Sequence, residues 1–195
     1  MRGKQLLAGA VAIIAIGAGS VPVAADSHKG ESGKGHTTTV KLRDNCDPAT
    51  FDAAFGPGTC APHGPLPTVP LGDFLAKLNP VDFGHPQWRN DPARVEIESE
   101  DTLKIVVRGG EFHTFTEVAK FGAGCIAPLN DALGLTTDVP TAAQCGAFFA
   151  TTGVTPGATL KVNHLTPGIH RFMCEIHPWM RTIVEVEGNE HEGED

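Results

Sequence analysis

The stretch that most constrains this 195-residue chain reads Phe172-Met173-Cys174-Glu175-Ile176-His177-Pro178-Trp179-Met180-Arg181. β-Forming residues flank it on both sides, so we predict that it leaves one strand and enters the next. A loop between two strands can direct a thiolate, an imidazole and a thioether at one point. We therefore predict that Cys174, His177 and Met180 bind one metal ion.

The donor types in this loop favour copper. One class of mononuclear copper site combines one Cys and two His in a trigonal plane with a long axial Met. Zinc prefers a closed shell of four donors without a thioether, so Met180 and the single Cys disfavour a structural zinc site. A surface thiol with incidental neighbours is the other alternative, but it gives no reason for an unpaired Cys174 in an exported chain.

A second histidine ligand must come from elsewhere, and His113 fits best. It follows a double-glycine turn and begins a predicted strand. His85 is the one serious rival. His164 lies at a predicted turn, and His170, four residues before Cys174, would lie roughly 13 Å along the same strand. For these three histidines we prefer a solvated or core role.

The Cys-x-x-His-x-x-Met spacing of residues 174–180, with a Pro-Trp pair inside it, resembles the ligand loop of the cupredoxins. The likeness is greatest to amicyanin and to bacterial plastocyanin-like proteins, and His113 matches the upstream His ligand of that family. The resemblance covers about residues 80–188. It implies an all-β, eight-stranded Greek-key sandwich, one type 1 copper per chain and one-electron transfer.

We expect a non-enzymatic electron carrier, a monomer whose redox protein partners dock near His177 and Trp179. Packing of Trp179 over the loop is the simpler alternative for that residue. A copper-binding protein for storage or delivery is the alternative function. A copper enzyme is a third class, but the sequence lacks the His-x-His pairs of multicopper oxidases and does not suggest a second copper.

Three features depart from the family pattern. An insertion over residues 122–157 carries Cys125 and Cys145 and widens the gap before Cys174. Thr114 stands where the family often has Asn after the upstream His. Ile176 stands where plastocyanin and amicyanin have Pro, so it keeps its backbone N–H. We hypothesise that the N–H groups of Thr114 and Ile176 both donate to the Cys174 thiolate and raise the reduction potential.

The N-terminus predicts export. Residues 1–25 combine a positive start, an apolar run and a small-residue cleavage site after Ala25, which together indicate a signal peptide. An uncleaved membrane anchor is the alternative. We therefore expect the mature protein to be secreted, periplasmic or on the cell surface, with no integral membrane segment after cleavage.

Five cysteines in an exported chain predict disulfides. Four of them allow three pairings, and the sequence alone does not choose among these. Local pairing, Cys46 with Cys60 and Cys125 with Cys145, is the simplest and would contribute about 3 kcal/mol per bridge. It leaves Cys174 free.

The charge and composition limit the remaining possibilities. The formal net charge is −8, which argues against nucleic acid or an anionic membrane as a partner. The 23 Gly and 15 Pro favour short strands joined by turns. We predict strands over residues 37–42, 93–97, 102–107, 111–121, 159–163, 169–174 and 182–187, and helices over residues 48–54, 71–78 and 141–151.

These elements suggest how the chain is organised. Beyond the signal peptide, we expect a flexible leader over residues 26–36 and an N-terminal extension with two short helices over residues 37–79. The copper-binding sandwich would cover residues 80–188, and residues 189–195 would form an acidic tail. The pattern does not decide whether the extension packs on the sandwich or serves a partner.

Overall fold

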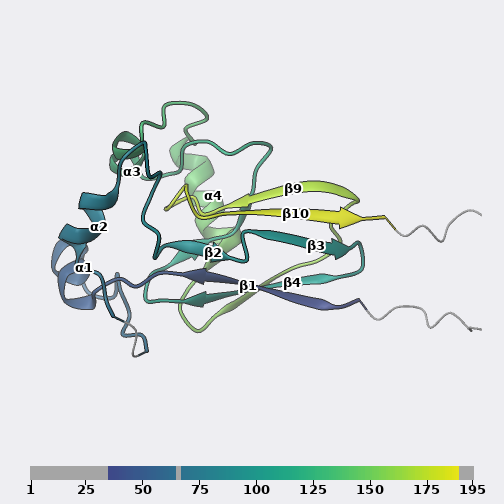
Figure 1. Cartoon of the computed structure of the whole chain (residues 1–195), viewed down its shortest axis with the longest axis horizontal. Coiled ribbons are helices and arrows are strands. Elements are labelled where there is room, and N and C mark those ends of the chain that lie inside the picture. The colour runs from purple at the N-terminus through teal and green to yellow at the C-terminus, as the bar shows by residue number, and fades with distance from the viewer. Residues whose placement is uncertain (1–34, 65–66, 189–195) are drawn as a thin grey trace, which may run out of the picture. The chain divides into compact units, whose positions relative to one another are not determined.

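The computed structural model describes residues 35–64 and 67–188, which form a mainly β structure with few helices (Figure 1). The predicted signal peptide, the leader up to residue 34 and the acidic tail lie outside the described residues. In the described part, no helix has the length and apolar character needed to cross a membrane.

The first sheet has four strands in the order β2-β1-β4-β8. They are β1 (Thr37–Arg43), β2 (Arg89–Asp91), β4 (Thr102–Arg108) and β8 (Thr159–Val162). β1 runs parallel to β4 along its whole length and antiparallel to β2. The first strand of the predicted N-terminal extension is thus an inner strand of a sheet.

The second sheet has the order β3-β10-β9-β6. Its strands are β3 (Arg94–Glu98), β10 (Arg181–Glu187), β9 (Gly168–Met173) and β6 (Thr116–Glu117). β3 and β10 alternate between buried and more exposed residues, because successive side chains of a strand point to opposite faces. β9 and β10 form the hairpin that carries the predicted metal loop.

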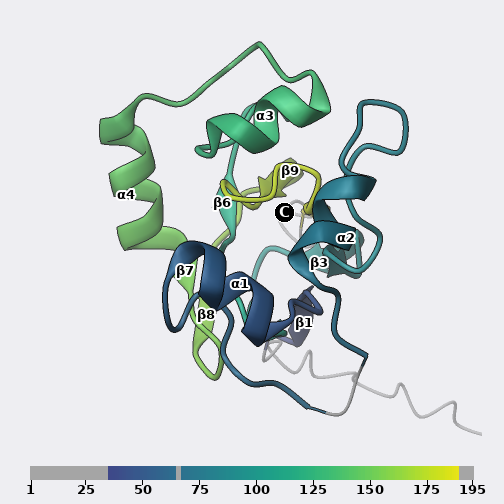
Figure 2. The same ribbon diagram turned by 90° about the vertical axis from the view of Figure 1, so that its left-hand side faces the viewer.

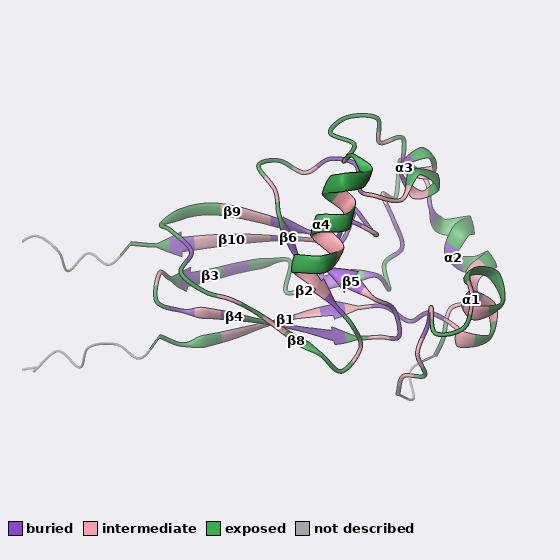
Figure 3. Cartoon of the chain, turned by 180° about the vertical axis from the view of Figure 1, so that it is seen from behind, coloured by how far each residue is buried: buried purple, intermediate pink, exposed green. Residues whose placement is uncertain are grey.

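The buried faces of both sheets contribute to one apolar core (Figure 3). The first sheet supplies Val40, Leu42, Leu103, Ile105 and Val107, and the second supplies Val95, Ile97, Phe172, Val184 and Val186. This is consistent with a cupredoxin-like sandwich; the Greek-key connectivity stays a prediction.

The strand predicted over residues 111–121 is divided in two. β5 (His113–Thr114) pairs with β7 (Gly153–Val154), whereas β6 pairs with β9 in the second sheet. Between them, Phe115 is buried with its ring stacked on Phe172. The chain therefore changes partners at Phe115, two residues after His113.

Four helices complete the described part: α1 (Pro48–Phe55), α2 (Leu71–Lys77), α3 (Ala127–Leu133) and α4 (Ala142–Thr152). Asp47 caps α1 as its sequence suggests, accepting a hydrogen bond from the Thr50 N–H. Helix α3 was not predicted, although Gly134 ends it in a left-handed conformation typical of helix ends. Helices α1, α2 and α3 lie beyond one end of the strands, and Figure 2 looks onto that end.

The two local disulfide pairings are confirmed. Cys46 bonds to Cys60, and Cys125 bonds to Cys145. The remaining cysteine, Cys174, is free and buried. The first bridge ties the segment before α1 to the segment after it, and the second ties the segment before α3 to α4.

Candidate metal centre

The loop between β9 and β10 is closed by its own backbone. The Cys174 N–H donates to the carbonyl of Met180 at 3.0 Å, and the Met180 N–H donates to the carbonyl of His177 at 2.8 Å. These two bonds fold the seven residues into a tight turn at the end of the hairpin. Cys174 and Met180 are both fully buried and belong to the same core cluster.

Three of the predicted donors meet at one point. Cys174 Sγ lies 3.7 Å from Nδ1 of His113 and 3.9 Å from Nδ1 of His177. In a trigonal site, bonds of roughly 2.0–2.3 Å at angles near 120° would place neighbouring donors about 3.7 Å apart. The spacing and chemistry of the three donors therefore fit one metal ion, and the buried thioether of Met180 adds a soft fourth candidate.

The rival histidines lie elsewhere. His85 stacks on Phe74 of α2 and contacts Trp88 edge-on. His164 lies in the loop after β8 and has a positive φ of 58°. His170 contacts Glu117, with Nδ1 and the carboxylate 2.6 Å apart. None of the three belongs to the group formed by His113, Cys174 and His177.

Backbone contacts to the sulfur are only partly as hypothesised. The Thr114 N–H donates to Cys174 Sγ at 3.4 Å, and the Thr114 hydroxyl accepts from the Glu175 N–H at 2.8 Å. Thr114 thus links the two ligand segments, through its hydroxyl rather than through an amide side chain. Among the described residues, no hydrogen bond from the Ile176 N–H to the sulfur is present, so that half of the hypothesis lacks structural support.

On the outer side of His113 lies a buried carboxylate that the sequence analysis missed. Nε2 of His113 is 2.8 Å from Oδ2 of Asp44, and both side chains are fully buried. Asp44 follows β1, and its sequence context shows only a lone acidic residue after a strand. A Cβ on Gly109 would overlap the Asp44 carboxylate, so this close approach requires glycine, but the sequence does not show which residue approaches it.

The outer side of His177 is built differently. Its Nε2 is 3.7 Å from Oε2 of Glu111, which also accepts a hydrogen bond from the Trp88 indole N–H. Phe74 of α2 contacts the imidazole edge-on with ring centroids 6.2 Å apart, and Trp179 does so at 5.3 Å. His177 is only 2% exposed as a result. Trp179 packs on it as predicted, whereas the contribution of α2 was not foreseen.

The charges at the centre reinforce one another. Burial lowers the pKa of His113, but its hydrogen bonds to Asp44 and Cys174 and their negative charges raise it to about 10. Burial raises the pKa of the Cys174 thiol, yet the two histidines hold it well below its usual value. The metal-free site therefore favours a thiolate, the form of cysteine that binds metals.

No family model and no curated protein matches the chain. Solved structures similar to it include a purple cupredoxin from Nitrosopumilus maritimus, which is 13% identical with a TM-score of 0.36 over 56% of this chain and 95% of its own. The plastocyanin of Dryopteris crassirhizoma is 11% identical with a TM-score of 0.36, over 77% and 100%. A reduced amicyanin variant is 19% identical with a TM-score of 0.31, over 49% and 70%. These likenesses are too weak to assign a function to this chain.

Proposed function

We propose that the chain is a mononuclear type 1 copper protein that transfers single electrons outside the cytoplasm, with His113, Cys174, His177 and Met180 as the copper ligands. The observation that carries the proposal is the convergence of one thiolate sulfur and two imidazole Nδ1 atoms, 3.7 and 3.9 Å from the sulfur, inside a water-excluded core. When bound, copper would supply a one-electron redox couple.

The chain's own residues would hold the donors rigidly and keep water away. His113, Cys174 and Met180 are fully buried and His177 nearly so. The closed 174–180 loop fixes three of these residues relative to one another, and Thr114 fixes their position against β5. Such a scaffold leaves little to reorganise when the charge of the site changes, which favours electron transfer.

Electrons would leave on the side of His177. Because this imidazole lies under Phe74 and beside Trp179, a redox partner docked at this end would reach the site through those rings rather than by touching His177 itself. The storage or delivery alternative calls for exposed, exchangeable ligands, and the burial of all four donors disfavours it. Export, in turn, is supported by the two disulfides, which persist in oxidising compartments.

The test is to load the purified protein with Cu(II) and to record its visible and EPR spectra. We expect an intense thiolate-to-copper band that disappears in Cys174→Ser and in His113→Gln but persists in His170→Gln, the matched control. Circular dichroism would verify that each variant is folded. A colourless chain that prefers Zn(II) would contradict the proposal, and reversible voltammetry of the blue form would separate an electron carrier from a copper store.

A further inference from the structure

The His113 imidazole lies between two acceptors. One ring nitrogen, Nδ1, faces the Cys174 sulfur at 3.7 Å, and the other, Nε2, lies 2.8 Å from Asp44 Oδ2. A carboxylate accepts hydrogen bonds and cannot donate one when ionised, so Nε2 must carry a proton. The neutral tautomer that keeps this bond has its lone pair on Nδ1, pointing towards the proposed metal position.

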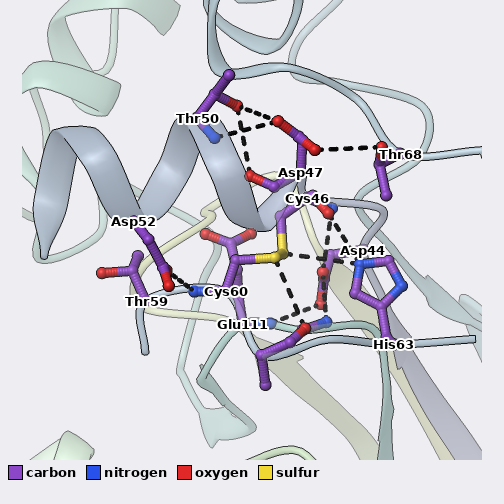
Figure 4. The surroundings of a disulfide bond; sticks show 12 residues. Asp44, Cys46, Asp47, Thr50, Asp52, Thr59, Cys60, His63, Thr68 and Glu111 are labelled. Carbon is purple, nitrogen blue, oxygen red and sulfur yellow. Dashed lines mark hydrogen bonds between the residues drawn. A yellow bond between two sulfur atoms is a disulfide. The ribbon is translucent and has the colours of Figure 1, made fainter. Parts of the chain in front are cut away.

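The Asp44 carboxylate is itself held in place. The Gly110 N–H donates to Oδ1 at 2.8 Å, and the Glu111 N–H donates to Oδ2 at 3.3 Å. The Cys46 N–H, next to the first disulfide, contacts Oδ1 at 3.4 Å (Figure 4). An ionised Asp44 therefore has three backbone donors besides the imidazole.

This arrangement has a consequence for the charge of the site. With Cu(II), the thiolate and Asp44 would balance the two positive charges of the ion if both imidazoles were neutral. With Cu(I), the same buried groups would leave one net negative charge. Because uncompensated charge is costly in a buried site, Asp44 favours the oxidised state.

The His177 side lacks an equivalent. Glu111 Oε2 is 3.7 Å from His177 Nε2, beyond hydrogen-bonding distance, and it is engaged by Trp88. The two imidazoles are therefore unequal, and the strong carboxylate contact belongs to His113.

We propose that Asp44 is a positioning residue of the metal centre, which orients His113 with Nδ1 towards the metal and lowers the reduction potential of the copper through its buried charge. The proposal rests on the proposed function, because it concerns the same site. A residue outside the proposed ligand set would thus control the balance between the two copper oxidation states.

The test compares Asp44→Asn with Asp101→Asn in the full chain. Asp101 is the matched control: it is also a buried aspartate that accepts backbone N–H bonds, from His36 and Glu98, but it lies in the β3–β4 turn and contacts no candidate ligand. Asp44→Asn should weaken Cu(II) binding about tenfold or more, the usual cost of losing a residue that orients a metal ligand. If Cu(I) binding is unchanged, a tenfold loss corresponds to a rise of about 59 mV in the one-electron potential. Asp101→Asn should change stability but neither quantity.

The outcomes separate the two proposals. If Asp44→Asn loses stability as Asp101→Asn does and keeps the wild-type potential and Cu(II) affinity, Asp44 is only structural and the inference is overturned. If the wild-type chain binds Cu(II) without a blue spectrum, the proposed function fails, while the Cu(II) affinities of the two variants still judge Asp44. Should Asp44→Asn not fold, Gly109→Ala provides a second route, because its added Cβ would displace the carboxylate; unchanged Cu(II) affinity there would also overturn the inference. A wild-type chain that binds no copper would refute both proposals.

Discussion

The loop of residues 174–180 and the N-terminal segment of residues 37–79 contribute differently to the metal centre. The loop supplies three candidate donors within seven residues and closes on its own backbone. The N-terminal segment supplies no donor, yet Asp44 holds His113 from one side and Phe74 covers His177 from the other. The loop would thus determine which metal the proposed site takes, whereas the distant segment determines how well the site is enclosed and which charges surround it.

The largest effect is expected from removing the Phe74 ring that covers His177. Phe74→Ala should destabilise the protein by about 4 kcal/mol, because Phe74 is 3% exposed and packs on Phe51, Trp88 and His177. It should also speed the removal of copper by an external chelator, measured by loss of the blue band. Leu75→Ala on the same helix is the control: with 49% of Leu75 exposed, it should cost less than about 1 kcal/mol. Equal chelation rates in the two variants would show that α2 does not shield the site.

The two disulfides test whether the N-terminal segment supports the site more than the 122–157 insertion does. They close loops of similar size in different surroundings. Their sequence separations are 14 and 20, so replacing either pair by alanine should cost about 3 kcal/mol in denaturant unfolding. Only loss of Cys46–Cys60 should also weaken Cu(II) binding, because Cys46 is next to the Asp44 contact. A larger effect on copper from the Cys125–Cys145 replacement would make the 122–157 insertion the more important support of the site.

A smaller effect concerns Glu175, which lies inside the loop. Burial and the Cys174 charge raise its pKa from 4.5 to about 7. Between these values the unfolded chain has released a proton that the folded chain retains, so the stability of the metal-free protein should fall as the pH rises from about 4.5 to 7. We expect a loss of about 2 kcal/mol that is absent in Glu175→Gln, measured by denaturant unfolding at pH 5 and pH 7.5. Parallel profiles for the two proteins would contradict this assignment.

The smallest expected effect is that of Ile176→Pro. Since the sulfur accepts its backbone hydrogen bond from Thr114, the loss of the Ile176 N–H should leave the reduction potential of the copper-loaded protein unchanged. Voltammetry of this variant decides between that expectation and the two-donor hypothesis, under which the potential would fall.

Much of the candidate site was accessible from local sequence patterns. The types and spacing of Cys174, His177 and Met180 indicate soft-metal chemistry in a short loop, and alternating residues predict most of the strands and their place in a sandwich. His113 could be selected among nine histidines because it follows the double glycine and lies near the start of a predicted strand. The disulfides, too, follow from proximity in the sequence, because short loops are the easiest to close.

The break between β5 and β6 was not predictable in this way. Residues 111–121 alternate well enough for a continuous strand, but two different sheets compete for them, and Phe115 stacks on Phe172. Pairing with one sheet or the other depends on partners far along the chain. The short strands β2 and β7 and the helix α3 were missed for a different reason. They are short, and their own residues carry weak local signals.

The sequence by itself therefore indicated three candidate donors in the 174–180 loop and the metal class that suits them, and it favoured the two local disulfides without excluding the other pairings, because these inferences depend on residues close together in the chain. Tertiary structure decided what surrounds those donors: the carboxylate of Asp44 on His113, the ring of Phe74 over His177 and the burial of both imidazoles. These contacts join residues separated by 69 and by about a hundred positions. Burial, and the charge effects that depend on it, arise only when such segments pack together, so no local pattern encodes them.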